Sequence, residues 1–174
     1  DLLSQAEHGT DSQVILVSTS KELIDAVETE IQSQMDVLPR KAIAEKAIAN
    51  SKLIFVENDT IALELINEYG PEHFIICTKY EAFYIDNIAN AGSVFIGNYT
   101  PESAGDYASG TNHTLPTNGY AKNYSGVNLD SFTKSMTFQK ISEKGIQNIG
   151  SAIEIMAEAE GLQAHKNAVT LRLK

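Results

Sequence analysis

Residues 52–96 read KLIFVENDTIALELINEYGPEHFIICTKYEAFYIDNIANAGSVFI, and the fold class follows from this segment. Short runs of β-branched and aromatic residues predict strands, and longer segments with apolar residues at helical spacing predict helices. The predicted elements alternate, with strands at 52–56, 74–77 and 94–96 and helices at 60–69 and 82–89. Strands that alternate with helices of this length are typical of α/β units with a mostly parallel sheet.

A similar pattern precedes this segment. Residues 1–8 resemble the end of a helix, and residues 13–18 predict a strand. Ser20 is the expected N-cap of the helix that follows, Pro39 ends that helix, and residues 40–50 predict another. We therefore expect an α/β fold, with a mostly parallel sheet, flanking helices and the outline of an incomplete Rossmann-like domain.

The segment from Gly97 to Gly126 differs in composition. It is rich in Gly, Asn, Ser, Thr, Tyr and Pro and has little apolar periodicity, so we expect no regular secondary structure there. Long ordered loops in compact domains are often functional, and a plain linker is the alternative.

A small, mainly helical tail domain is expected after this loop. Residues 129–132 predict a turn of helix, and residues 136–139 predict a short strand. Ser142 starts a long helix that continues to Glu160, Gly161 ends it, and a short helix covers residues 163–173. The expected boundaries are 1–127 for the α/β portion and 128–174 for the tail, which is too small to bury its apolar face alone.

The charge balance limits the partners of this chain. Its 13 basic and 23 acidic residues give a net charge of −10. Nucleic-acid-binding proteins usually present a basic face, and anionic membranes repel an acidic protein. No apolar run approaches the roughly 20 residues that span a bilayer. We therefore expect neither nucleic acid nor membrane as a partner.

The single cysteine and the first residues carry two further expectations. Cys77 alone cannot form an intrachain disulfide or a Cys-rich zinc site, and its place at the end of an apolar run predicts a core residue. One buried, reduced thiol fits the cytoplasm. The chain begins in a helical pattern, at Asp1, without an initiator Met, so we expect it to be a piece of a longer polypeptide.

All four histidines lie in short polar clusters, each with a carboxylate or carboxamide and a glycine nearby. Histidine is the usual general base near neutral pH and the commonest metal ligand. The clusters are Gln5–Gly9, Gly70–His73, Gly105–His113 and Glu160–His165.

Each cluster has a simpler explanation when it is taken alone. Gln5 and His8 fit a surface helix end, Glu72 and His73 a solvated turn, and Asp106 and His113 a hydrogen-bonded loop. His165 fits a helix-capping or surface role. Together they favour a mononuclear zinc enzyme, because His, Gln and Asp side chains offer the mixed nitrogen and oxygen ligands that suit zinc. No dinucleotide fingerprint, P-loop or serine nucleophile elbow accompanies them.

Several longer motifs carry a resemblance that covers the whole chain in order. The most specific is the block Thr100–His113, which reads TPESAGDYASGTNH. The others are DLLSQAEHG (1–9), YGPEH (69–73), AGSVF (91–95), LPT (115–117), YSG (124–126) and AEGLQAH (159–165). The chain resembles the C-terminal part of histidinol dehydrogenases.

This resemblance implies a function and a set of residue roles. Members of the family oxidise L-histidinol to L-histidine through histidinal, with two hydride transfers to NAD. It implies that Gln5, His8 and Asp106 are zinc ligands and that His165 is the fourth, supplied by the tail of the second subunit of a homodimer. These ligands also contact the substrate.

The resemblance assigns the remaining site residues as well. Glu72 and His73 match the acid/base pair, with His73 also touching substrate, and His113 and Glu160 match substrate-contacting positions. Most NAD-binding residues are expected in the N-terminal part of the full-length family members. Two other functions compete with a dehydrogenase, namely a non-catalytic zinc-binding dimerisation module and a zinc hydrolase. The long match at 100–113 argues against the hydrolase.

Overall fold

The computed structural model describes all 174 residues, which divide into unit 1, residues 1–132, and unit 2, residues 133–174. The division falls between Phe132 and Thr133, a little beyond the boundary expected after residue 127.

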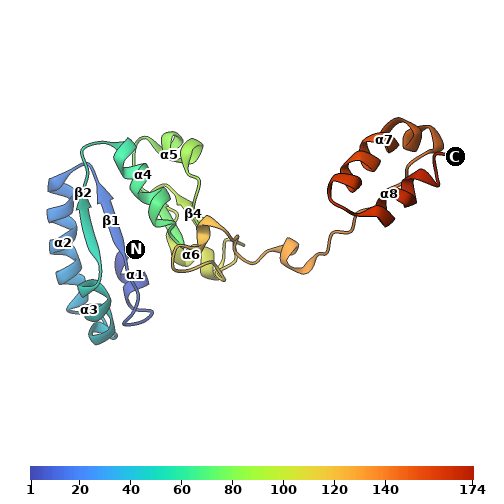
Figure 1. The fold of residues 1–174 in the computed structure, drawn as a ribbon. Coiled ribbons are helices and arrows are strands. Elements are labelled where there is room, and N and C mark those ends of the chain that lie inside the picture. The colour runs from blue at the N-terminus through green and yellow to red at the C-terminus, as the bar shows by residue number, and fades with distance from the viewer. The chain divides into compact units, whose positions relative to one another are not determined.

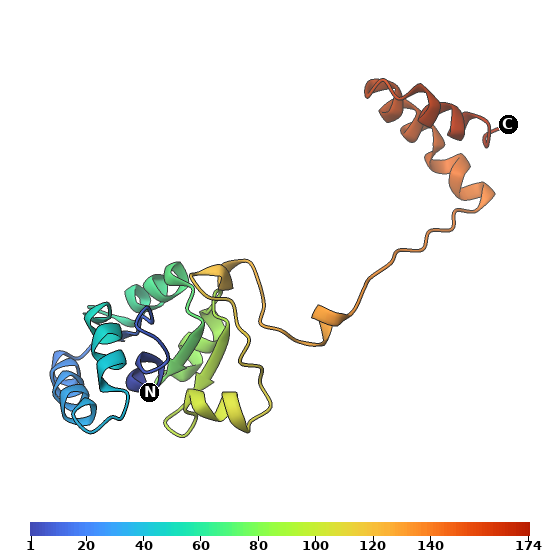
Figure 2. The ribbon, with the colours of Figure 1, turned by 90° about the horizontal axis from the view of Figure 1, so that it is seen from below.

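Unit 1 contains four short strands in two parallel pairs (Figures 1 and 2). Strand β1 (Ile15–Ser18) pairs with β2 (Lys52–Phe55), and β3 (His73–Ile76) pairs with β4 (Ser93–Ile96). The predicted α/β class with parallel strands is therefore confirmed.

Helices pack against these strands and form two apolar cores. The first core joins α1 (Leu2–Ala6), α2 (Lys21–Met35) and α3 (Lys41–Ala49), and the second joins α4 (Asp59–Tyr69) and α5 (Glu81–Asn87) to β3. The side chains of Ser20 and Asn58 accept hydrogen bonds from the third residue beyond each, as N-caps do.

Two expectations for unit 1 were wrong. The segment 97–126 is not free of regular structure, because it contains α6 (Glu102–Tyr107) and the 3₁₀ turn Tyr120–Lys122. Cys77 is exposed rather than buried, because β3 ends at Ile76 and the next residue leaves the sheet. A second 3₁₀ turn, Leu129–Phe132, was predicted correctly.

Unit 2 is a pair of helices, α7 (Glu143–Ala159) and α8 (Gln163–Thr170). Ser142 caps α7, and Gly161, with φ of 73°, turns the chain into α8. A Cβ at Gly150 would lie 2.8 Å from the Leu173 side chain, so the helix surface approaches the end of the chain closely there. The strand predicted at 136–139 does not form, because unit 2 offers no other strand for it to pair with.

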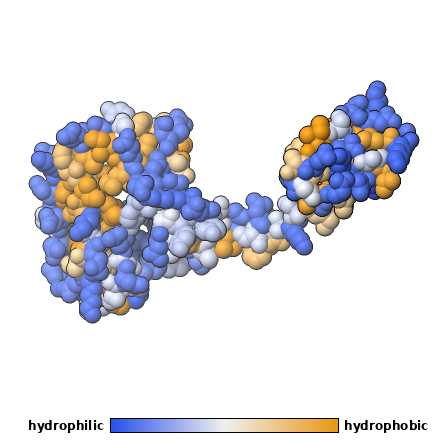
Figure 3. Space-filling view, in the orientation of Figure 1, coloured by the Kyte–Doolittle hydropathy of each residue, from blue (hydrophilic) through white to orange (hydrophobic).

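Apolar side chains reach the surface over part of unit 1. Figure 3 shows them gathered over β1 and β2, and Phe55 at the end of β2 is 43% exposed. Every helix in the structure is too short or too polar to cross a bilayer.

Candidate active site

Helix α6 presents two carboxylates to one side. Glu102 and Asp106 are four residues apart, which places them one turn apart on the same helix face. Gly105 lets this helix lie against β4, since a Cβ there would be 2.7 Å from the Phe95 ring. The close packing of α6 on Phe95 therefore fixes where both carboxylates point.

His8 meets these carboxylates from the N-terminal end of unit 1. One ligand atom from each of His8, Glu102 and Asp106 lies within 4.8 Å of the others. Helix α1 ends at Ala6, so His8 is held by the turn that follows, where its backbone N–H donates to the Gln5 carbonyl. One imidazole nitrogen and two carboxylates form a donor set that suits zinc.

Gln5 adds an amide to the same region. Its Nε2 atom is buried and has no hydrogen-bond partner. Buried polar side chains are nearly always hydrogen-bonded, so an unsatisfied one calls for a specific role such as ligand binding. The amide nitrogen itself does not bind a cation, so Gln5 would offer zinc its Oε1 atom. With His8 and Asp106 this oxygen gives the mixed nitrogen and oxygen donors that suit zinc, so the residues present fit that metal.

Glu72 and His73 lie where β3 begins. Gly70 ends α4 in the left-handed conformation, with φ of 63°, and Pro71 leads into the strand. The Glu72 carbonyl accepts a hydrogen bond from Ser93 at 2.9 Å. The His73 ring packs on Phe95 with a centroid distance of 5.9 Å. Both side chains are thus positioned by a rigid strand.

Charged groups surround Glu72. Burial raises the pKa of the Glu72 carboxyl, positive charge on His73 and His8 opposes that rise, and the charges of Glu102 and Asp106 add to it. A carboxylate with a raised pKa is a better proton acceptor near neutral pH.

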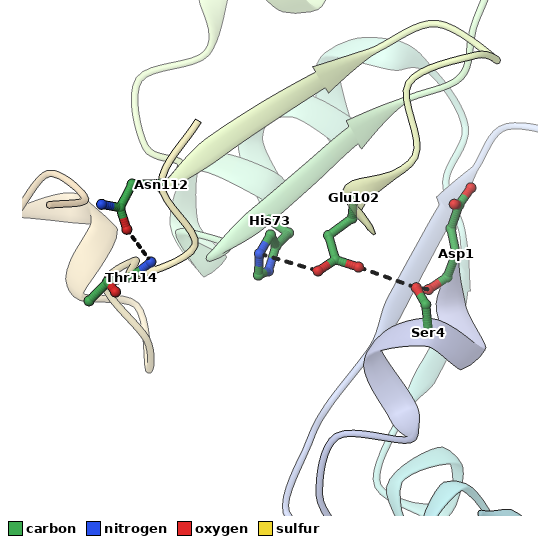
Figure 4. A network of polar contacts seen from close by, with 6 residues as sticks. All are labelled: Asp1, Ser4, His73, Glu102, Asn112 and Thr114. Carbon is green, nitrogen blue, oxygen red and sulfur yellow. Dashed lines mark hydrogen bonds and ion pairs between the residues drawn. The ribbon is translucent and has the colours of Figure 1, made fainter. Parts of the chain in front are cut away.

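Glu102 connects His73 to Ser4 of helix α1, as Figure 4 shows. Its Oε1 lies 3.8 Å from His73 Nε2, and its Oε2 accepts a 3.3 Å hydrogen bond from the Ser4 hydroxyl. No sequence pattern singles out Glu102, although it lies inside the block 100–113. Glutamate is common just after a proline in the first turn of a helix, so only the burial of its side chain marks Glu102 as a candidate site residue.

A cavity of about 1150 Å³ adjoins the pair. Gln5, Glu72 and His73 line it, together with residues of β1 and β3. Cavities that hold small molecules have volumes of roughly this order, so Glu72 and His73 are accessible to a small molecule.

The other expected site residues belong to other segments of the chain. His113 is an exposed residue of unit 1 in the loop after α6. Glu160 follows α7 and His165 lies in α8, both exposed in unit 2. Within unit 1 the structure therefore brings together Gln5, His8, Glu72, His73 and Asp106.

The family model for histidinol dehydrogenase matches residues 1–173. The chain belongs to the histidinol dehydrogenase family. It is 62% identical, over its whole length, to a histidinol dehydrogenase of Bacteroides fragilis, and 52% identical to one of Campylobacter jejuni. The crystal structure of a histidinol dehydrogenase from Elizabethkingia anophelis matches 99% of the chain with a TM-score of 0.94 and 56% identity. The chain spans 41% of the length of those two relatives and 40% of the crystallised chain.

Proposed function

We propose that this chain is the part of a histidinol dehydrogenase that holds the catalytic zinc and the acid/base pair. The parent enzyme oxidises L-histidinol to L-histidine in two steps with NAD, in the cytoplasm. The observation that carries the proposal is the meeting of His8, Asp106, Glu72 and His73 in one region of a chain with this family membership.

Gln5, His8 and Asp106 would hold the zinc from this subunit, and His165 of the second subunit would complete the set. The bound zinc would hold the substrate and act as a Lewis acid. NAD would be held mostly by residues outside this chain and would accept the hydrides.

The chain's own residues then perform the proton chemistry. In the first step His73 takes the proton of the alcohol oxygen while the neighbouring carbon gives up hydride, which leaves an aldehyde. In the second step Glu72 takes a proton from water as the water oxygen attacks the aldehyde carbon. The resulting hydrate anion, whose former carbonyl oxygen carries the negative charge, gives up a second hydride and becomes the carboxylic acid. His113 and Glu160 would contact the substrate.

A turnover assay with the full-length protein tests this proposal. We expect histidinol-dependent NADH formation, with two NADH for each histidine, and a loss of at least about a hundredfold in kcat for H73N with zinc retained. The matched control is E64Q, an exposed carboxylate on α4, which should behave as wild type. Zinc binding without any turnover would instead favour a non-catalytic zinc-binding module.

The homodimer is a separate part of the proposal. Unit 2 carries exposed apolar side chains, among them Ile155 and Met156, at 68% and 64% exposure, and a helix pair of this size buries too little area to be stable alone. Contact with a second subunit would cover such a surface.

Mixing two inactive variants tests whether the tail acts in the other subunit. H8N has an intact tail, and H165N has an intact His8. If His165 is supplied across the dimer, mixed dimers regain one working site, and activity returns when the two proteins are unfolded and refolded together. If each subunit uses its own His165, the mixture stays inactive.

A further inference from the structure

Glu102, in unit 1, is the only charged side chain that is buried in the structure, with 2% of its surface exposed. An isolated carboxylate is expensive to bury unless charge or hydrogen bonds compensate it. Most charged residues of a small protein stay at the surface. A position in the first turn of a helix does not by itself bury a glutamate, so the burial of Glu102 needs another explanation.

Two side chains, Ser4 and His73, contact the Glu102 carboxylate, and they offset the cost of its burial unequally. The Ser4 hydroxyl has one proton and two acceptors, the Asp1 carbonyl at 2.6 Å and Glu102 Oε2 at 3.3 Å. The shorter contact goes to Asp1, so Ser4 is a weak partner for the carboxylate. His73 Nε2, 3.8 Å from Oε1, is the one basic side-chain group in ion-pair range of Glu102, and the His73 side chain is only 12% exposed.

Glu102 also lies near His8 and Asp106, so a role as a metal ligand has to be weighed. Zinc in enzymes usually takes three protein ligands and substrate or water, and structural sites take four. Under the proposed function Gln5, His8, Asp106 and His165 already fill that set. A fifth protein ligand would leave less room for substrate, whereas His73 has no other acidic partner within ion-pair distance.

We infer that Glu102 is a positioning residue that holds His73 Nε2 and so directs Nδ1 to take the substrate proton. This inference rests on the proposed function. The distance of 3.8 Å is too long for a hydrogen bond, but catalytic hydrogen bonds are often long without substrate and shorten in the complex. When His73 takes the proton it becomes a cation, and the buried carboxylate stabilises that cation at the moment it forms.

The test compares E102Q, H73N and the double variant in the full-length enzyme, with E64Q as the control for loss of an exposed carboxylate. For E102Q we expect kcat to fall about tenfold to a hundredfold with KM changed less than about threefold, because the base is misplaced and substrate binding is kept. Zinc content should stay at the wild-type level. In the H73N background the same substitution should change kcat by less than about twofold, since Glu102 acts through His73.

Two readouts separate positioning from a merely structural role. The first is the split between the two kinetic constants, because kcat should fall in E102Q while KM stays within about threefold of the wild-type value. E102D, which keeps the charge, should recover part of the lost kcat. If E102Q does not fold, as judged by circular dichroism, E102D in the wild-type and H73N backgrounds gives the same comparison.

Three results would overturn the inference. Loss of zinc in E102Q would make Glu102 a metal ligand, and an unchanged kcat would make it a structural residue. An equal loss of kcat from E102Q in the wild-type and H73N backgrounds would show that Glu102 does not act through His73. Absence of histidinol oxidation by the wild-type enzyme is a distinct result, because it would refute the proposed function and with it this inference.

Discussion

Gly92 lies directly against the backbone of Glu72. A Cβ at position 92 would come within 2.6 Å of the Glu72 carbonyl oxygen, and the Gly92 N–H donates to the Pro71 carbonyl at 2.9 Å. Only a residue without a side chain lets β4 pass this close to the start of β3. The position of Glu72, and of His73 next to it, is thus fixed by a contact between two backbones.

We predict that G92A lowers the free energy of unfolding by about 1–3 kcal/mol, because the methyl group meets backbone that cannot move aside alone. Urea unfolding measures this. The control is G145A in the first turn of α7, where the nearest atom to a new Cβ is an Ile141 methyl carbon at 3.1 Å and alanine favours helix. Equal stability of G92A and wild type would mean that the two strands pass less closely than described.

A second glycine sets the position of α6. A Cβ at Gly105 would meet the Phe95 ring at 2.7 Å and the Thr111 hydroxyl at 2.8 Å, and Phe95 is 4% exposed. G105A should displace α6 and the Asp106 carboxylate, so we expect zinc affinity to fall about tenfold or more. Competition with a chelating dye measures the affinity. In the double variant G105A/F95L the smaller leucine side chain makes room for the new methyl group, so part of the zinc affinity should return. No recovery of zinc affinity would contradict this account of the packing.

Much of the fold of unit 1 could be predicted because its signals are local. Alternating apolar runs located all four strands, and Ser20 and Ser142 were recognised as the starts of helices from their place before apolar helical segments. Helix α6 was missed because its six residues include a glycine and little apolar spacing. Its stability comes from packing on Phe95, which no local pattern reveals.

The wrong predictions share one cause, because each feature depends on how the chain folds and not on the local sequence. Residues 136–139 have the composition of a strand, but a strand needs a partner and unit 2 has none. Cys77 follows three apolar residues, yet it lies just past the end of β3 and is exposed. Glu102 was missed for the opposite reason, since glutamate is usually exposed and its burial depends on His73 and Ser4, distant in sequence.

The hydroxyl of Tyr84 stabilises unit 1. It donates a 2.7 Å hydrogen bond to Asp59 Oδ1 at the start of α4, and the ring lies in the second apolar core. We predict that Y84F lowers the free energy of unfolding by about 1–2 kcal/mol at neutral pH, because the bond is made to a charged acceptor. Chemical denaturation measures this difference.

The same residue predicts a response to alkaline pH. Burial, then the hydrogen bond and the negative charge of Asp59, raise the pKa of Tyr84 well above its ordinary value of 10.0. The folded chain therefore holds the phenol proton more tightly than the unfolded chain. The stabilisation is complete below pH 10 and is lost as pH rises further. Y84F should lose less stability than wild type above pH 10, and equal losses would contradict this assignment.

The most direct test of the central claim is a zinc titration of the full-length protein in four forms: wild type, H8N, D106N and H73N. If His8 and Asp106 hold the metal while His73 moves protons, wild type and H73N bind about one zinc per subunit with similar affinity. H8N and D106N then bind zinc at least about tenfold more weakly. Undiminished zinc affinity in H8N and D106N, or loss of zinc in H73N, would contradict the account.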